Sequence, residues 1–239
     1  MTTYLNIESI PFWAPEQVRL RRLITSAVAD AVIPALSEIN KAWTFHEIDG
    51  PILTPQICMN KEYTGDDVFF TQVFKSENQL ALRPETTPSS YQYARERFRN
   101  KKSFPACVWQ AGKSFRVEAS DGARAATLRF NEFYQLEFQC IYAKGTMADY
   151  RTPVTTAMRT ALDAVMLGTS RLVESDRLPS YSTQTMDIEM PWKGEWKEIA
   201  SISTRTDFGD EYEVLELALG LDRAVLIAEQ NYASRKESM

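Results

Sequence analysis

Two segments that alternate between apolar and polar residues constrain the fold of this chain more than any other feature. They read CVWQAGKSFRVE (107–118) and RFNEFYQLEFQ (129–139). A period of two is typical of β-strands that bury one face. Ten residues that include a glycine, ASDGARAATL, join the two segments. The pattern therefore predicts a long antiparallel hairpin.

Two residues of the second segment break its alternation. Phe133 falls among amides and charged groups on the polar face, and Glu132 falls on the apolar face. A bare aromatic ring gains little from water but can stack beneath a flat ligand. Phe133 therefore fits either a solvated face, where the ring gains little, or the floor of a ligand site, where it could stack. Glu132 needs a buried partner that the sequence does not reveal.

The rest of the chain predicts further helices and strands without a linker between domains. Apolar residues recur at helical spacing from Pro15 to about Trp43, where Pro34 is expected to kink or break the helix. A second helix is predicted over 153–167, capped by Thr152 and ended by Gly168. The remaining predicted elements are strands near 45–55, 79–83, 183–189 and 196–208, a helix after Pro88, and a strand feeding a helix over 214–230. We predict one α+β domain over residues 1–239, with a mostly antiparallel sheet flanked by helices.

Composition excludes several classes of function. A net charge of −5 argues against a generally basic nucleic-acid-binding surface, although not against a local basic patch. The three cysteines are far apart, which fits a reducing compartment and gives no zinc framework. The single histidine, His46, excludes a multi-histidine metal site. Because neither a signal-like N-terminus nor a membrane-length apolar run is present, we expect a cytoplasmic protein with no membrane partner.

The polar face of the predicted hairpin carries groups that suit a nucleotide. Arg116 and Glu118 share a face of the first strand, and Arg129, Phe133 and Glu137 share a face of the second. A guanidinium can hold phosphate oxygens, a carboxylate can accept a hydrogen bond from an exocyclic amine, and a ring can stack on a purine. These are the requirements of an ATP site. The spacing alone fits a solvated face with salt bridges as well, and favours it.

The order of these residues resembles the three signature motifs of class II aminoacyl-tRNA synthetases. FRVE (115–118), a loop and RFNEF (129–133) resemble the second motif, and GLDR (220–223) resembles the third. FHEIDGPIL (45–53) resembles the first, with Thr44 in place of the usual glycine. The motifs occur in the expected order and extend from about residue 18 to 230. The resemblance implies the class II catalytic fold.

Within class II, the likeness is strongest to glycyl-tRNA synthetases of the homodimeric type. Their stretches LRPETAQ, IGKxFRNE, RVREFTMAEIE, GELEGIANRTDF and VIEPSAGLDR correspond to LRPETTP (82–88), AGKSFRVE (111–118), RFNEFYQLEFQ (129–139), GEWKEIASISTRTDF (194–208) and VLELALGLDR (214–223). In this chain Leu217, Ala218 and Val117 replace the proline, serine and asparagine of that pattern. Only 16 residues follow Arg223, so we expect the family's anticodon-binding domain to be absent.

The resemblance implies a role for each matching residue. Arg116 would hold the ATP α-phosphate and the substrate carboxylate, and Glu118 would accept a hydrogen bond from the adenine amino group. Phe133 and Arg223 would enclose the adenine ring. Arg129 and Arg124 would bind the terminal phosphates. Glu216 would be a ligand of the amino-acid ammonium or of Mg²⁺. The carboxylates that would bind the amino-acid ammonium are Glu85, Glu137 and Glu198.

The implied reaction is attack of an amino-acid carboxylate on the α-phosphorus of ATP. It needs positioning and charge stabilisation by arginines and Mg²⁺, and no protein nucleophile. The resemblance thus predicts ATP-dependent activation of glycine or another small amino acid to the aminoacyl-adenylate. Transfer to an acceptor would follow, and the tRNA 3′ end is the first candidate.

Two alternatives stay open at this point. In the first alternative, the same adenylation serves a non-tRNA acceptor such as a carrier protein, another nucleic acid or a small molecule. The second alternative is a non-catalytic synthetase-like accessory subunit. A site without catalytic function would not need all five of the matching residues Arg116, Glu118, Phe133, Glu216 and Arg223. The basic stretch 94–102 fits an anionic partner, or more simply a solvated helix face. A homodimer is predicted because the first motif forms the subunit interface in the resembled family.

Overall fold

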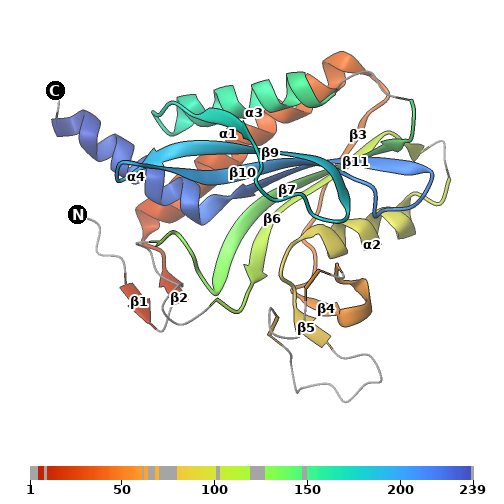
Figure 1. Cartoon of the computed structure of the whole chain (residues 1–239), viewed down its shortest axis with the longest axis horizontal. Helices are drawn as coiled ribbons and strands as arrows, with labels where there is room; N and C mark the ends of the chain where they lie inside the picture. Colours follow the sequence, from red (N-terminus) through yellow and green to blue (C-terminus); the bar gives the residue numbers. More distant parts are fainter. Residues whose placement is uncertain are drawn as a thin grey trace.

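The centre of the molecule is a seven-stranded sheet (Figure 1). The computed structural model describes residues 5–7, 10–60, 62–63, 68–69, 80–100, 103–118, 127–146 and 150–237. The strand order across the sheet is β3 (Thr44–Glu47), β6 (Ala106–Phe115), β7 (Glu132–Ala143), β11 (Tyr212–Gly220), β10 (Glu195–Arg205), β9 (Ser182–Trp192) and β8 (Arg171–Glu174). Only the β3–β6 pair in this sheet is parallel. The predicted α+β fold with a mostly antiparallel sheet is confirmed.

Helices cover the two faces of the sheet unequally. Three of them, α1 (Pro15–Ile39), α3 (Arg151–Val165) and α4 (Leu221–Glu237), bury the large hydrophobic cluster against one face. The fourth, α2 (Thr87–Arg97), lies on the opposite side, against β6 and β7 (Figure 1). Three short elements, β4 (Leu53–Pro55), the 3₁₀ turn Gln56–Cys58 and β5 (Leu80–Leu82), lie beside α2, and β1 (Leu5–Ile7) pairs with β2 (Ile10–Phe12).

The predicted hairpin is confirmed as the pair β6–β7. Its register runs from Ala106 opposite Ile141 to Phe115 opposite Glu132. Leu136 and Phe138 of β7 point into the large hydrophobic cluster, as their period of two predicts. The alternate residues Glu137 and Gln139 are just as buried. The polar face of β7 is therefore an interior surface of the protein and not a solvated one.

Two sequence expectations about the helices differ from the structure: a break of α1 at Pro34 and a cap of α3 at Thr152 are not found. The helix α1 continues through Pro34 without a break. A proline removes one N–H donor from the helix, and the flanking residues Val28, Val32 and Leu36 are fully buried in the core. Their packing holds the helix together across the lost hydrogen bond.

The helix α3 begins two residues earlier than its sequence signals indicate. Arg151 is its first residue and Tyr150 its N-terminal flanking residue, so Thr152 lies inside the first turn and is not the cap. At the other end Leu167, with φ of 52°, takes the left-handed conformation, and Gly168 donates to the carbonyl of Asp163. None of the helices in the described ranges is both long and apolar enough to cross a membrane.

Candidate active site

A cavity of about 690 Å³ lies on the face of the sheet that α1, α3 and α4 leave uncovered. This volume is typical of a site for a ligand of nucleotide size. Nine of the predicted site residues line it: Glu85, Arg116, Glu118, Arg129, Phe133, Glu137, Glu198, Glu216 and Arg223. The tenth, Arg124, lies outside the described residues.

The pairing of strands brings these residues together from distant parts of the chain. Glu137 on β7 is opposite Ala218 on β11, and Glu216 is opposite Gln139. Directly opposed residues in an antiparallel pair share a face, so Glu137 and Glu216 point to the same side of the sheet. On β10 an irregularity in register between Glu198 and Ala200 brings both Glu198 and Ile199 to the cavity.

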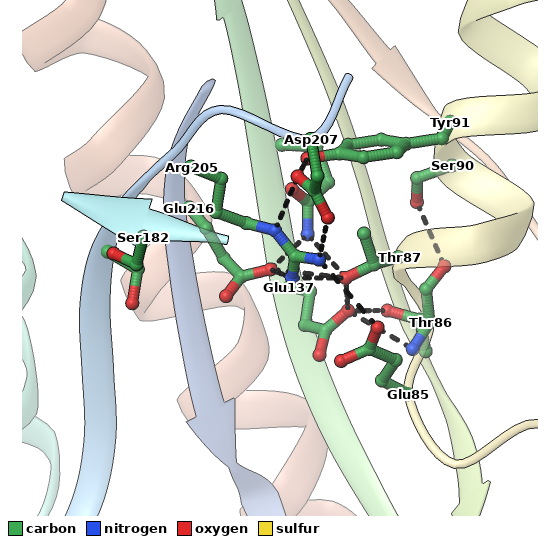
Figure 2. A network of polar contacts seen from close by, with 12 residues as sticks. Glu85, Thr86, Thr87, Ser90, Tyr91, Glu137, Ser182, Arg205, Asp207 and Glu216 are labelled. Carbon is green, nitrogen blue, oxygen red and sulfur yellow. Dashed lines mark hydrogen bonds and ion pairs between the residues drawn. The ribbon is translucent and has the colours of Figure 1, made fainter. Parts of the chain in front are cut away.

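The inner end of the cavity is a cluster of buried carboxylates. Glu85, Glu137 and Glu216 are each at most 5% exposed. The backbone N–H and the hydroxyl of Thr86 both donate to Glu137, as does the hydroxyl of Thr87. The same Thr87 hydroxyl lies 3.1 Å from Glu216, so the two carboxylates share its single proton. The loop that leads into α2 thus fixes two of the three carboxylates in place (Figure 2).

Arg205 is the cation that neutralises part of this cluster, and the sequence reading did not single it out. Its guanidinium lies 2.6 Å from Glu216, 2.6 Å from Asp207 and 3.8 Å from Glu85 (Figure 2). The ring of Tyr181 packs against it, with 4.1 Å between the guanidinium carbon and the ring centroid. The only signal for Arg205 is its place in TRTDF (204–208), inside the stretch GEWKEIASISTRTDF.

The cluster carries more negative charge than Arg205 can balance. Burial, together with the nearby Glu216 and Glu85, raises the pKa of Glu137 to about 8. Burial likewise raises the pKa of Glu85, although Arg205 opposes that shift. Burial acts to lower the pKa of Arg205, but Glu216 and Glu85 outweigh it and keep that pKa well above its ordinary value. Without a ligand, Glu137 therefore holds a proton at neutral pH, and the cluster favours an incoming cation.

The outer end of the cavity is lined by arginines and an aromatic ring. Arg116 donates to the carbonyl of Pro84 at 3.0 Å, and its guanidinium carbon lies 5.3 Å from the centroid of Phe133. Arg223 donates to the carbonyls of Leu128 and Glu198, both at 3.0 Å. Burial lowers the pKa of Arg223, although the carboxylate of Glu198 opposes the shift. Both guanidinium groups are thus anchored on backbone oxygens and line the cavity.

A salt bridge joins Glu118 and Arg129, the other two predicted site residues at the outer end. Arg129 lies 3.3 Å from Glu118, and the Arg129 side chain is more than half exposed. Such an exposed pair is weak, so either partner can exchange it for a ligand group.

Arg83 supports both ends of the cavity and was also missed by the sequence reading. It is 1% exposed and donates to the carbonyls of Gly50 and Lys113 at 2.9 and 2.8 Å. The guanidinium passes so close to Gly112 that a Cβ there would lie 2.2 Å from Arg83 Nη2. Position 112 therefore requires glycine. Arg83 fixes the start of the segment that carries Pro84 and Glu85.

Three features noted in the sequence lie away from the cavity. Glu132 pairs with Lys113, and both side chains are partly exposed, so its partner is not buried. His46 packs against the rings of Tyr93 and Phe98, and burial lowers its pKa. In the stretch 94–102, Arg99 pairs with Glu96 on an exposed face, while Lys101 and Lys102 lie outside the described residues.

Glu216 is the predicted Mg²⁺ ligand, and its surroundings fit only a modest role in binding a metal. One of its oxygens already accepts from Arg205, Gln139 and Thr87. Across the described ranges, no group of three or more acidic, histidine or cysteine side chains is arranged to hold a metal. A Mg²⁺ ion commonly uses one or two carboxylates together with substrate phosphates, and Glu216 fits that arrangement through its second oxygen.

Comparison with known proteins shows which family this chain is similar to. Residues 70–223 match the family described as the tRNA synthetase class II core domain (G, H, P, S and T). The glycine–tRNA ligase of Staphylococcus aureus (strain JH9) is 30% identical over 138 residues, which are 56% of this chain and 29% of that protein.

Two solved structures share the fold at low sequence identity. The prolyl-tRNA synthetase of Cryptosporidium parvum, complexed with halofuginone and AMPPNP, superposes with a TM-score of 0.73 at 14% identity. The match covers 94% of this chain and 48% of that one. The Giardia lamblia prolyl-tRNA synthetase, in complex with prolyl-adenylate, gives a TM-score of 0.72 at 15% identity, over 93% and 48% of the two chains. This chain spans about half the length of these synthetases and less than a third of the ligase. With the family match extending over more than half of its residues, the chain belongs to the class II tRNA synthetase core-domain family.

Proposed function

We propose that this protein activates an amino acid with ATP, forming an aminoacyl-adenylate and pyrophosphate. The observation that carries the proposal is one cavity with opposite chemistry at its two ends. Buried carboxylates suit an ammonium group at the inner end, and anchored arginines beside Phe133 suit a nucleotide at the outer end. A class II core supports this assignment of the cavity.

ATP binds at the outer end in the proposed complex. Adenine stacks on Phe133, with the Arg223 guanidinium on its other face. Glu118 accepts a hydrogen bond from the adenine amino group, and in doing so it releases Arg129 for the terminal phosphates. Arg124 is proposed for the same phosphates from the loop that joins β6 and β7. Arg116 holds the α-phosphate.

The amino acid binds at the inner end with its ammonium among Glu85, Glu137 and Glu216. Glu198 lies 4.0 Å from Arg223 and also lines the cavity. The ammonium takes the place of the proton on Glu137, because a cation favours the ionised carboxylate. The carboxylate of the amino acid then points toward Arg116, the outer-end arginine whose charge interacts with Glu85 and Glu137 of the inner cluster.

The reaction requires alignment and charge stabilisation rather than a protein nucleophile. A carboxylate oxygen attacks the α-phosphorus, a new P–O bond forms, and the bond to the bridging oxygen of pyrophosphate breaks. Arg116 stabilises the negative charge on the equatorial oxygens, and Arg223 and Arg129 stabilise the departing pyrophosphate. When bound, Mg²⁺ neutralises phosphate charge, and Glu216 would hold it.

The substrate and the assembly belong to the same proposal. The likeness to a glycine–tRNA ligase over 138 residues supports glycine or another small amino acid, and the family supports the tRNA 3′ end as acceptor. The first-motif segment forms β3, at the edge of the sheet in one chain. Pairing through such an edge supports a homodimer, and the cytoplasm, where tRNA and ATP meet, is the proposed location.

The test is ATP–pyrophosphate exchange with each of the twenty amino acids, with and without added tRNA. We expect one or a few amino acids to give exchange and Arg116→Ala to lower its rate roughly 10²–10³-fold. Arg159→Ala, an exposed arginine on α3, is the matched control and should exchange normally. Absence of exchange with every amino acid under both conditions would overturn the proposal, as would normal exchange by Arg116→Ala.

A further inference from the structure

A row of small side chains leads from Glu137 across the sheet to another buried carboxylate. Ala218 on β11 is opposite Glu137 on one side and Ser201 on β10 on the other. Ser201 is in turn opposite Asp187 on β9. Since opposed residues share a face, these four side chains point to the same side of the sheet, and all four line the cavity.

The floor between the two carboxylates is low and polar. Ala218 and Ser201 are small, and the neighbouring row continues from Glu216 to Ser203 and Thr185. The hydroxyls of Ser203 and Thr185 lie 3.1 Å apart and bond to each other. Neighbouring strands are about 4.8 Å apart, so the Cα atoms of Ala218 and Asp187 are separated by roughly 10 Å. This floor is open enough for a side chain of several atoms.

Neighbouring groups compensate the negative charge of the Asp187 carboxylate only in part. It is 8% exposed, and burial raises its pKa to about 6, although a hydrogen bond from Ser175 opposes that shift. Arg177 is the nearby cation, and Glu198 and Asp176 are nearby anions. The side chain of Arg177 is 80% exposed and already lies 3.6 Å from Glu198. A buried carboxylate in this position gains most from a donor that a ligand supplies.

A site that accepts only glycine needs a floor filled by bulky side chains instead of an open one. Larger amino acids are rejected only by filling the space beside the α-carbon, because each added methylene in an open pocket improves binding. Here the position beside Glu137 is Ala218, and no bulky side chain stands between it and Asp187 along the row of opposed residues.

We infer that the amino acid activated here has a side chain ending in a hydrogen-bond donor, a hydroxyl or an ammonium group, which lies over Ala218 and Ser201 and binds Asp187. The inference rests on the proposed adenylation, and it replaces glycine as the expected substrate by an amino acid with a polar side chain. Asp187 is then the residue that determines specificity. With an apolar isostere, the buried Asp187 keeps only the hydrogen bond from Ser175 and lacks the donor that the ligand would supply, and this penalty is the source of discrimination.

The test measures kcat/KM for ATP–pyrophosphate exchange with pairs of amino acids that differ only in the donor. Suitable pairs are serine with alanine, threonine with valine, and ornithine with norvaline, with glycine as reference. We expect one donor-bearing member to exceed both its isostere and glycine by at least about tenfold. Asp187→Ala should remove most of that preference. Asp187→Asn should retain it for a hydroxyl and lose it for an ammonium.

Two further variants separate specificity from damage to the fold. Glu189→Gln changes a carboxylate on the same strand, outside the residues that line the cavity, and should keep the full preference. Ala218→Leu raises the floor and should lower kcat/KM for the donor-bearing amino acid at least about tenfold more than for glycine. The unfolding temperature of each variant shows whether it folds.

Three results overturn the inference in distinguishable ways. If glycine is the best substrate and Asp187→Ala leaves the ranking unchanged, the proposed function holds and this inference fails. If Asp187→Ala raises KM for ATP equally with every amino acid, Asp187 binds the ribose instead. If no amino acid supports exchange, the proposed function fails and the inference fails with it.

Discussion

The two ends of the cavity are built on different principles. At the inner end, carboxylates are buried and tied to Arg205, Thr86 and Thr87 by direct side-chain bonds (Figure 2). At the outer end, Arg116 and Arg223 are held through backbone carbonyls. The inner end therefore contributes to the stability of the fold whether or not a ligand is present. The outer end leaves charged groups available, so its residues matter chiefly when a substrate binds.

The largest effect of this difference is expected on folding, at Arg205. Arg205→Ala leaves the buried Glu216 and Glu85 and the partly exposed Asp207 without their cation, and it should lower the free energy of unfolding by about 3–5 kcal/mol. Urea denaturation measures the loss. Arg171→Ala breaks the more exposed pair with Glu189 and should cost less than about 1 kcal/mol. Equal losses at the two positions would contradict the assignment of stability to the inner end.

Arg116→Ala should do the reverse, with a large loss of activity and a small change in stability. Removing one charged donor at the reacting phosphate costs about 3 kcal/mol of transition-state stabilisation, a fall of roughly 10²–10³ in kcat. Exchange kinetics and the unfolding temperature, measured on the same preparation, check both halves. If the variant loses its folded structure together with its activity, then the outer end also contributes to stability, which contradicts the proposed difference between the two ends.

The pH dependence of stability tests the charge excess at the inner end. In the folded protein the pKa of Glu137 is about 8, against 4.5 for an ordinary glutamate. The folded state then binds more protons than the unfolded state between these values, so stability falls as pH rises from about 4.5 to 8.

One such group contributes at most about 1.4 kcal/mol per pH unit. Asp222, whose pKa burial raises to about 7, acts in the same direction. Glu137→Gln should flatten the decline, which unfolding temperatures from pH 5 to 8 would show. An unchanged slope in this variant would mean that the proton is held elsewhere in the cluster.

The smallest of these effects is expected at Phe133. Phe133→Leu keeps an apolar floor but removes aromatic stacking, which contributes about 0.5–1.5 kcal/mol. KM for ATP should rise roughly two- to tenfold, while KM for the amino acid stays constant. A rise in the amino-acid KM would place the ring at the wrong end of the cavity.

The strand and helix patterns that are local in the chain were predictable from the sequence. The hairpin β6–β7 and the strand–helix unit β11–α4 follow from periods of two and of about 3.6 residues. The strand β8, RLVE, was missed because four residues carry too little pattern. The uninterrupted course of α1 through Pro34 depends on core packing, which a local proline rule does not include.

The candidate site was predictable to a different extent at its two ends. The residues at the outer end lie in short motifs, so a resemblance can name them one by one. Arg83 and Arg205 escaped notice because nothing in their local sequence marks an arginine for burial, and arginines are rarely buried. Their partners, Gly50 and Lys113 for Arg83 and Glu85 for Arg205, are distant in sequence. Only the assembled sheet brings such pairs together.

Arg83, which passes close to Gly112, connects the segments that form the two ends of the cavity. The same arginine that spans the first-motif loop and β6 is followed directly by Pro84, whose carbonyl holds Arg116, and by Glu85 of the inner cluster. Pro84 and Glu85 are consecutive residues, so a displacement of this segment would disturb the carbonyl that holds Arg116 and a carboxylate of the inner cluster together. A side chain larger than glycine at position 112, which does not line the cavity, would push against Arg83 and should therefore disturb both ends.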